Sequence, residues 1–153
     1  MKTRTMYILL LTFAHLGLSA QPAADNTAIK QKISPFLSWV GTWKGEGSMT
    51  MPSGEIAKSS VDEKIEAKLD NTVILIQGLG KTSNPEKVVH EALGVLTYDQ
   101  RSNEYKFKTW IRDGRTTDAW FNVIAENNYQ WGFETPGGKI RYSIVIDPAK
   151  KTW

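Results

Sequence analysis

Few side chains in this sequence are suited to catalysis, and the most suited of them is a single histidine. His90 is the only histidine beyond an apolar N-terminal run that contains His15. The chain has no cysteine, so neither a Cys-His pair nor a multi-histidine metal site can form in the processed protein. A Ser-His-Asp triad would have to use His90, and no Gly-x-Ser-x-Gly elbow is present. These features favour a binding protein over an enzyme.

Carboxylates offer one further route to chemistry. Asp62, Glu63 and Glu66 alternate with lysines, a pattern typical of a solvated face. A pair such as Glu63 with Glu91, placed inside a barrel, would suit general acid and base catalysis. We expect the solvated face, because neither residue of the pair follows a clean inward apolar alternation.

Two arginines are candidates for ligand binding. Arg112 or Arg141, if either reached into an apolar interior, would hold a ligand carboxylate in a bidentate fork. Alternation places Arg141 on the face opposite Tyr142, which is the outer face. Arg141 is therefore either a solvated residue or, as the alternative, a ligand-binding one.

Short strands must position these residues. Regular turn signals separate runs of alternating or β-branched residues, as in an antiparallel up-and-down barrel or sandwich. Residues 55–69 suit a helix as well as a strand, and only the family resemblance given below favours a strand. The expected strands are 41–51, 55–69, 72–78, 88–98, 104–112, 116–125, 129–135 and 139–146.

A short helix should precede the strands. Between residues 28 and 40, apolar residues recur with helical spacing at Ile29, Ile33, Phe36, Leu37 and Val40. Pro35 predicts a break within this segment. We expect the helix to cap one mouth of the barrel.

Alternation also predicts what lines the interior. Lys106 and Lys108 favour water, which turns Tyr105, Phe107, Thr109 and Ile111 inward. The interior is then apolar and aromatic, either as a ligand cavity or as a filled core. The expected ligand-binding residues are Trp43, Tyr105, Phe107, Thr109, Trp131, Arg141 and Tyr142.

The motif Gly41-x-Trp43-x-Gly45-x-Gly47, followed by Pro52, resembles the N-terminal signature of the nitrobindins. These are haem-binding ten-stranded barrels of the calycin group, which includes lipocalins and fatty-acid-binding proteins. Residues 94–99 (GVLTYD), Tyr105, residues 109–113 (TWIRD) and residues 141–142 are similar to uncharacterised exported bacterial calycin-like proteins. The resemblance covers residues 36–153 and implies a hydrophobic ligand or, through His90, haem. It also implies about two more C-terminal strands than this chain supplies, so we expect a truncated barrel with an open edge, prone to self-association.

The N-terminus reads as a signal peptide. Lys2 and Arg4 precede an apolar run that ends at Leu18-Ser19-Ala20, too short to span a membrane. We predict a signal peptide over residues 1–20, a lead-in and helix over 21–35 and the barrel domain over 36–153. Loss of the first two cations leaves 17 basic against 16 acidic residues, a balance that does not suit nucleic-acid binding.

Together these features predict an all-β, calycin-like barrel exported to a periplasm or the extracellular space. Its expected function is to bind a small hydrophobic or amphipathic molecule without a cofactor or metal. Two alternatives stay open. One is a nitrobindin-like haem protein acting on reactive nitrogen species, and the other is an interaction protein that pairs through an exposed barrel edge.

Overall fold

The computed structural model describes residues 25–50, 53–83 and 85–147, and the predicted signal peptide and Pro52 lie outside these residues. A short helix, α1 (Thr27–Ile33), leads directly into a 3-10 helix, η1 (Ser34–Trp39). Eight strands follow: β1 (Gly41–Thr50), β2 (Ile56–Lys68), β3 (Val73–Ser83), β4 (Glu86–Asp99), β5 (Glu104–Ile111), β6 (Thr116–Ala125), β7 (Asn128–Thr135) and β8 (Gly138–Val145).

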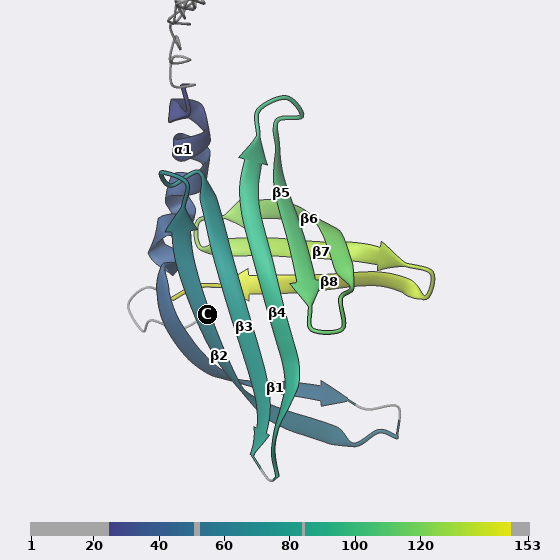
Figure 1. Ribbon diagram of the computed structural model, residues 1–153. Coiled ribbons are helices and arrows are strands. Elements are labelled where there is room, and N and C mark those ends of the chain that lie inside the picture. Colours follow the sequence, from purple (N-terminus) through teal and green to yellow (C-terminus); the bar gives the residue numbers. More distant parts are fainter. Residues whose placement is uncertain (1–24, 51–52, 84, 148–153) are drawn as a thin grey trace, which may run out of the picture.

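The strands form one antiparallel meander, in which each strand pairs with the next in the sequence. In Figure 1, β3 to β5 run steeply side by side, and β6 to β8 cross them at a large angle. The sheet therefore curls into a half-barrel. The predicted all-β, up-and-down antiparallel fold with a short N-terminal helix is confirmed. Within the described residues β1 and β8 remain the two edges of the sheet.

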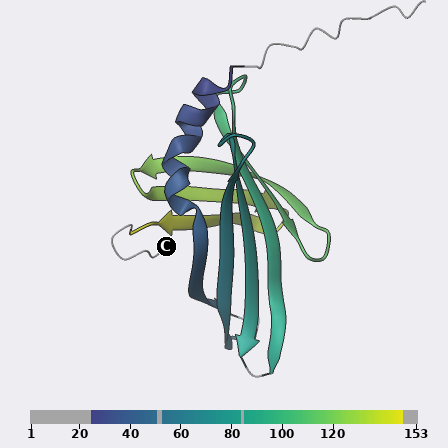
Figure 2. The same ribbon diagram turned by 60° about the vertical axis from the view of Figure 1, so that its left-hand side comes forward.

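The N-terminal helical segment closes one end of the half-barrel (Figure 2). Ile33, Phe36 and Trp39 are fully buried there. Their spacing of three residues fits η1, because side chains of a 3-10 helix align at every third position. Leu37 and Val40, predicted to be buried on an α-helical spacing, are instead 37% and 46% exposed. The prediction was wrong for these two residues because the segment with Pro35 near its start forms a tighter, 3-10 helix. The break expected at Pro35 anticipated this change only in part.

The strand predictions hold for residues 55–69, where β2 alternates as a strand rather than forming a helix. By contrast, β3 and β4 are longer than predicted. β3 continues past Gly78 and Gly80 to Ser83, and β4 begins at Glu86, with a register shift between Gly80 and Lys81. The glycines therefore bend the hairpin rather than end it.

The core lies at the end that the helices close. Ile65, Ile74 and Leu96 are fully buried on the inner face of adjacent strands. Above them, the ring of Phe36 lies within 5.6 Å, centroid to centroid, of four other aromatic rings: Trp39, Tyr105, Phe121 and Tyr129. Burial of one such large side chain contributes about 1.5–3 kcal/mol, so this cluster is a main source of stability.

Candidate functional site

The opposite end of the half-barrel is hollow. A concave groove of about 930 Å³ lies on the inner face of the sheet, with residues of β2 to β8 and of the β5–β6 turn around it. Its floor is made of small residues, Gly78, Ala92 and Gly94, which lie on the neighbouring strands β3 and β4. These small residues on β3 and β4 leave room for the groove.

Register explains why the groove is deep beside β2. In one row across the sheet, Trp43 lies opposite Glu63, Glu63 opposite Gly78, and Gly78 opposite Ala92. Two of the three positions that follow Trp43 in this row therefore carry at most a methyl group. A ligand could reach the Glu63 side chain across them.

Gly94 marks the boundary between the filled and the hollow end. A Cβ atom at this position would lie 2.9 Å from Phe107 Cε2 and 3.6 Å from Ile76 Cβ. Phe107 thus packs directly over the Gly94 backbone. Beyond this contact the inner face is open.

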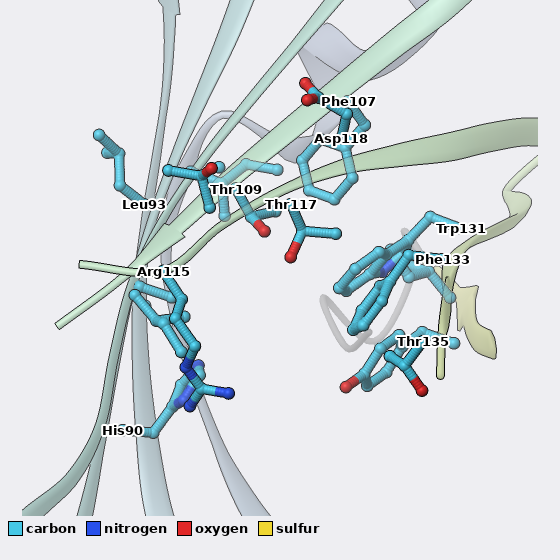
Figure 3. A pocket seen from close by; sticks show the side chains of 18 of the residues that line it. His90, Leu93, Phe107, Thr109, Arg115, Thr117, Asp118, Trp131, Phe133 and Thr135 are labelled. Carbon is cyan, nitrogen blue, oxygen red and sulfur yellow. The ribbon is translucent and has the colours of Figure 1, made fainter. Parts of the chain in front are cut away.

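An aromatic wall from β7 and β8 flanks the groove. Trp131 stacks on Tyr142 with ring centroids 4.1 Å apart and planes inclined by 13°. Phe107 meets Trp131 edge to face at 5.0 Å. In Figure 3, Trp131 and Phe133 lie on one side of the groove and His90 and Arg115 on the other. Flat aromatic faces of this kind suit the apolar body of a small molecule.

Hydroxyl groups and paired charges complete the lining. Thr109 and Thr117 lie opposite each other on β5 and β6, and both line the groove. Three charged residues of the lining form ion pairs: Asp118 with Lys108 at 3.2 Å, Glu134 with Lys139 at 2.7 Å and Arg115 with Asp113 at 2.7 Å. The threonines can therefore orient a polar group, whereas these charges already have partners.

Glu63 differs from the other charged groups of the groove. Its Oε2 atom is buried and has no hydrogen-bond partner among the described residues. Burial disfavours the ionised form and raises the pKa of the Glu63 carboxyl from its ordinary value of 4.5 to about 7. This carboxyl therefore changes charge near neutral pH.

The prediction that Glu63 belongs to a solvated face was wrong. Strand alternation places Glu63 in the same phase as Ile65, which is fully buried, and this signal could have identified it. Glu91 is exposed and lies 3.8 Å from Arg112, with which it forms an ion pair on the outer face. The possible catalytic pair of Glu63 with Glu91 is thus divided between the two faces of the sheet. Arg112 likewise does not line the groove.

The structure separates the predicted ligand-binding residues into two groups. Phe107, Thr109, Trp131 and Tyr142 come together in the groove. Trp43 and Tyr105 lie at the closed end, where Trp43 Nε1 donates a hydrogen bond to the Trp39 carbonyl at 2.7 Å and Tyr105 Oη donates one to the Lys32 carbonyl at 3.0 Å. Arg141 is exposed, opposite Gly132 on β7, and is not part of the groove lining. The ligand-binding roles themselves stay predictions.

His90 lies at the exposed end of the groove, on β4 opposite Gly80. A haem bound in the groove would find one imidazole there, beside the small residues Gly78 and Ala92. Its propionates would find Arg115, which already forms an ion pair with Asp113. The geometry thus offers one axial ligand and an apolar wall, and haem binding through His90 stays a prediction.

No helix in the described part of the chain is both long and apolar enough to cross a membrane. Residues 25–50, 53–83 and 85–147 also contain no group of three or more His, Cys, Asp or Glu side chains arranged to hold a metal ion. Comparisons of the chain with models of protein families, with curated proteins and with solved structures found no match.

Proposed function

We propose that this protein is an exported binding protein that holds a small hydrophobic or amphipathic molecule in the groove. The observation that carries this proposal is the contrast between an apolar, aromatic wall and a floor of small residues around a space of about 930 Å³. Such a combination is typical of small-molecule sites rather than of a packed core. Export rests on the predicted signal peptide over residues 1–20.

Binding would be driven by burial of the ligand's apolar surface. Each Å² removed from water contributes about 25 cal/mol. The stacked pair of Trp131 and Tyr142 offers a flat surface, of which Tyr142 is 45% exposed without a ligand. The hydroxyl groups of Thr109 and Thr117 would fix the orientation of a polar end.

Titration with a neutral polarity-sensitive dye, N-phenyl-1-naphthylamine, tests this proposal. We expect saturable binding with one site per chain, and a rise in melting temperature at saturating dye. The variant Ala92→Phe fills the groove floor and should weaken binding by about tenfold or more, because the bulky ring takes the ligand's place.

Glu91→Phe is the matched control, because it adds the same ring at the adjacent position on the outer face. This variant should bind the dye as the parent protein does. Equal binding by both variants, or no saturable binding by the parent, would contradict the proposal. Native mass spectrometry of protein purified from the producing cells would then give the mass of any retained ligand.

Export is tested separately. We expect N-terminal sequencing of the protein from producing cells to begin near Gln21, after cleavage at Ala20. A protein that retains Met1 would contradict this part of the proposal and leave the groove proposal intact.

The open edge of the sheet supports a second candidate function, partner binding by strand addition. The β8 strand pairs only with β7 among the described residues, and Tyr142 and Val145 on it are 45% and 64% exposed. An exposed edge with apolar side chains is a site for pairing with another strand. If this function dominates, sedimentation should show mass that rises with concentration, and Val145→Lys should reduce it. A monomer at all concentrations, with intact dye binding, would favour the groove.

A further inference from the structure

We propose that Glu63 is the recognition point for a positively charged amino group on the groove ligand. This inference rests on the proposed function and narrows its ligand class to apolar amines. It starts from one atom: Glu63 Oε2 is buried, and no residue in the described part of the chain gives it a hydrogen bond. Buried polar atoms in folded proteins nearly always have a partner, and an exception at a binding surface points to a group supplied from outside.

The groove gives a ligand access to this carboxyl. Gly78 and Ala92 follow Glu63 in the same inward row, so the next two side chains in this row are a hydrogen atom and a methyl group. A Cβ atom on Gly78 would lie 3.6 Å from Glu63 Oε1, so a methyl-sized group fits against this oxygen of the carboxyl without a clash. An amino group is of similar size.

The charge balance of the groove favours a cation over a neutral donor. The side chains of Asp118, Glu134 and Arg115 all have ion-pair partners outside the lining. Among the described residues no ion pair involves Glu63. The uncompensated charge of the groove is therefore a negative one, and an ammonium group would both neutralise it and donate the missing hydrogen bond.

The aromatic wall suits the rest of such a ligand. Trp131 and Tyr142 present stacked faces and Phe107 an edge, which together accommodate an apolar or aryl body. Aromatic faces also attract cations, so these rings would not repel the ammonium group of a ligand that enters the groove. The ligand class is thus a primary amine with one apolar body.

The raised pKa of Glu63, about 7, makes the recognition dependent on pH. Its own row contributes no other titratable group, since Trp43, Gly78, Ala92 and Ile111 occupy it. The other titratable or charged groups that line the groove are His90 on β4, Arg115 in the β5–β6 turn, Asp118 on β6, Glu134 on β7 and Tyr142 on β8. His90→Gln serves as the control for the imidazole of the groove lining.

A pair of matched probes tests the proposal: 2-(1-naphthyl)ethylamine and 2-(1-naphthyl)ethanol, titrated into the full chain by calorimetry. At about pH 8 we expect the amine to bind tenfold or more tightly than the alcohol, as for a hydrogen bond between charged groups. In Glu63→Gln this preference should fall to within about twofold, with the alcohol affinity unchanged.

Glu134→Gln is the matched control, because it removes a carboxylate of the same groove that already has a partner. It should keep the preference for the amine. At about pH 6 the preference should shrink in the parent and in His90→Gln alike, because Glu63 becomes protonated. In Glu63→Gln the small remaining preference should not change with pH.

The outcomes separate the two proposals. If the alcohol binds and the amine has no advantage, or if Glu63→Gln keeps the advantage, this inference is overturned and the groove remains a binding site. If neither probe binds the parent, the proposed function fails and the inference fails with it.

Discussion

The two ends of the half-barrel use the same strands and differ in what fills them. At the closed end, η1 inserts Phe36 and Trp39 between the strands, and both are fully buried. At the open end, the inward positions of the same β3 and β4 strands carry Gly78 and Ala92, and a groove remains. Strand pairing is continuous across both ends, so backbone hydrogen bonding does not decide where the cavity lies.

The difference teaches how stability and binding are divided within one small fold. Aromatic rings at the closed end pack on one another within van der Waals reach, whereas the aromatic wall at the open end leaves faces exposed. The closed end therefore anchors the sheet, and the open end can keep unfilled space and a buried carboxyl. Four predictions test this division, from the largest expected effect to the smallest.

The first prediction compares one phenylalanine from each end. Phe36→Ala should destabilise the protein by about 3–5 kcal/mol, because it leaves a cavity among four aromatic rings. Phe133→Ala, in the half-buried groove lining, should cost about 1 kcal/mol. Urea unfolding measures both values. If Phe36→Ala does not fold, Phe36→Leu should still lower the free energy of unfolding more than Phe133→Leu does. Equal losses of stability at the two ends would contradict the comparison.

The second prediction concerns pH. Between pH 4.5 and about 7 the folded protein keeps a proton on Glu63 that the unfolded chain has released, so this residue makes stability fall as pH rises through that window. Above this pH window, Glu63→Gln should be more stable than the parent by at most about 3 kcal/mol. Below the window, the two proteins should have the same free energy of unfolding. Urea unfolding of both proteins across this range measures the difference. A stability difference between the two proteins that does not change across this range would contradict the assignment.

The third prediction locates the boundary between the two ends with a pair of glycines. Gly94→Ala should destabilise by about 1–3 kcal/mol, because the new methyl group would overlap the Phe107 ring. Gly78→Ala should be neutral or stabilise by up to about 1 kcal/mol, since its methyl group finds only ordinary contacts and reduces the freedom of the unfolded chain. Thermal unfolding measures both. If Gly78→Ala were the more destabilising of the two, the boundary between the filled and the hollow end would not lie at Gly94.

The smallest expected effect is at His90. His90→Ala should change stability by less than about 0.5 kcal/mol, because the side chain is exposed at the rim. Adding hemin to the parent should give no histidine-dependent Soret band, since a single exposed imidazole holds the iron weakly. A Soret band that appears in the parent and is lost in His90→Ala would instead make the open end a haem site.

Much of the fold could be predicted from local patterns. Alternation, β-branched runs and turn residues identified seven of the strands. For residues 55–69 a helix fitted equally well, and the resemblance to calycin-like barrels decided for a strand. The same alternation placed Phe107, Thr109, Trp131 and Tyr142 on the inner face. Prediction was poorer where the apolar pattern fits both an α-helical and a 3-10 spacing. After Pro35 the 3-10 spacing holds, so Trp39 is buried and Val40 is exposed.

The sequence by itself determined the all-β meander, the short N-terminal helix and the inner face of each strand, because these depend on residues close together in the chain. Only the tertiary structure decided which inner positions are filled. Trp43 and Tyr105 share the inward phase of the groove residues, yet η1 covers them and leaves the groove empty. The surroundings of the Glu63 carboxyl likewise depend on register, because strand pairing places Gly78 beside Glu63 and Ala92 beside Gly78. Pairing across strands, which local sequence does not encode, set the site.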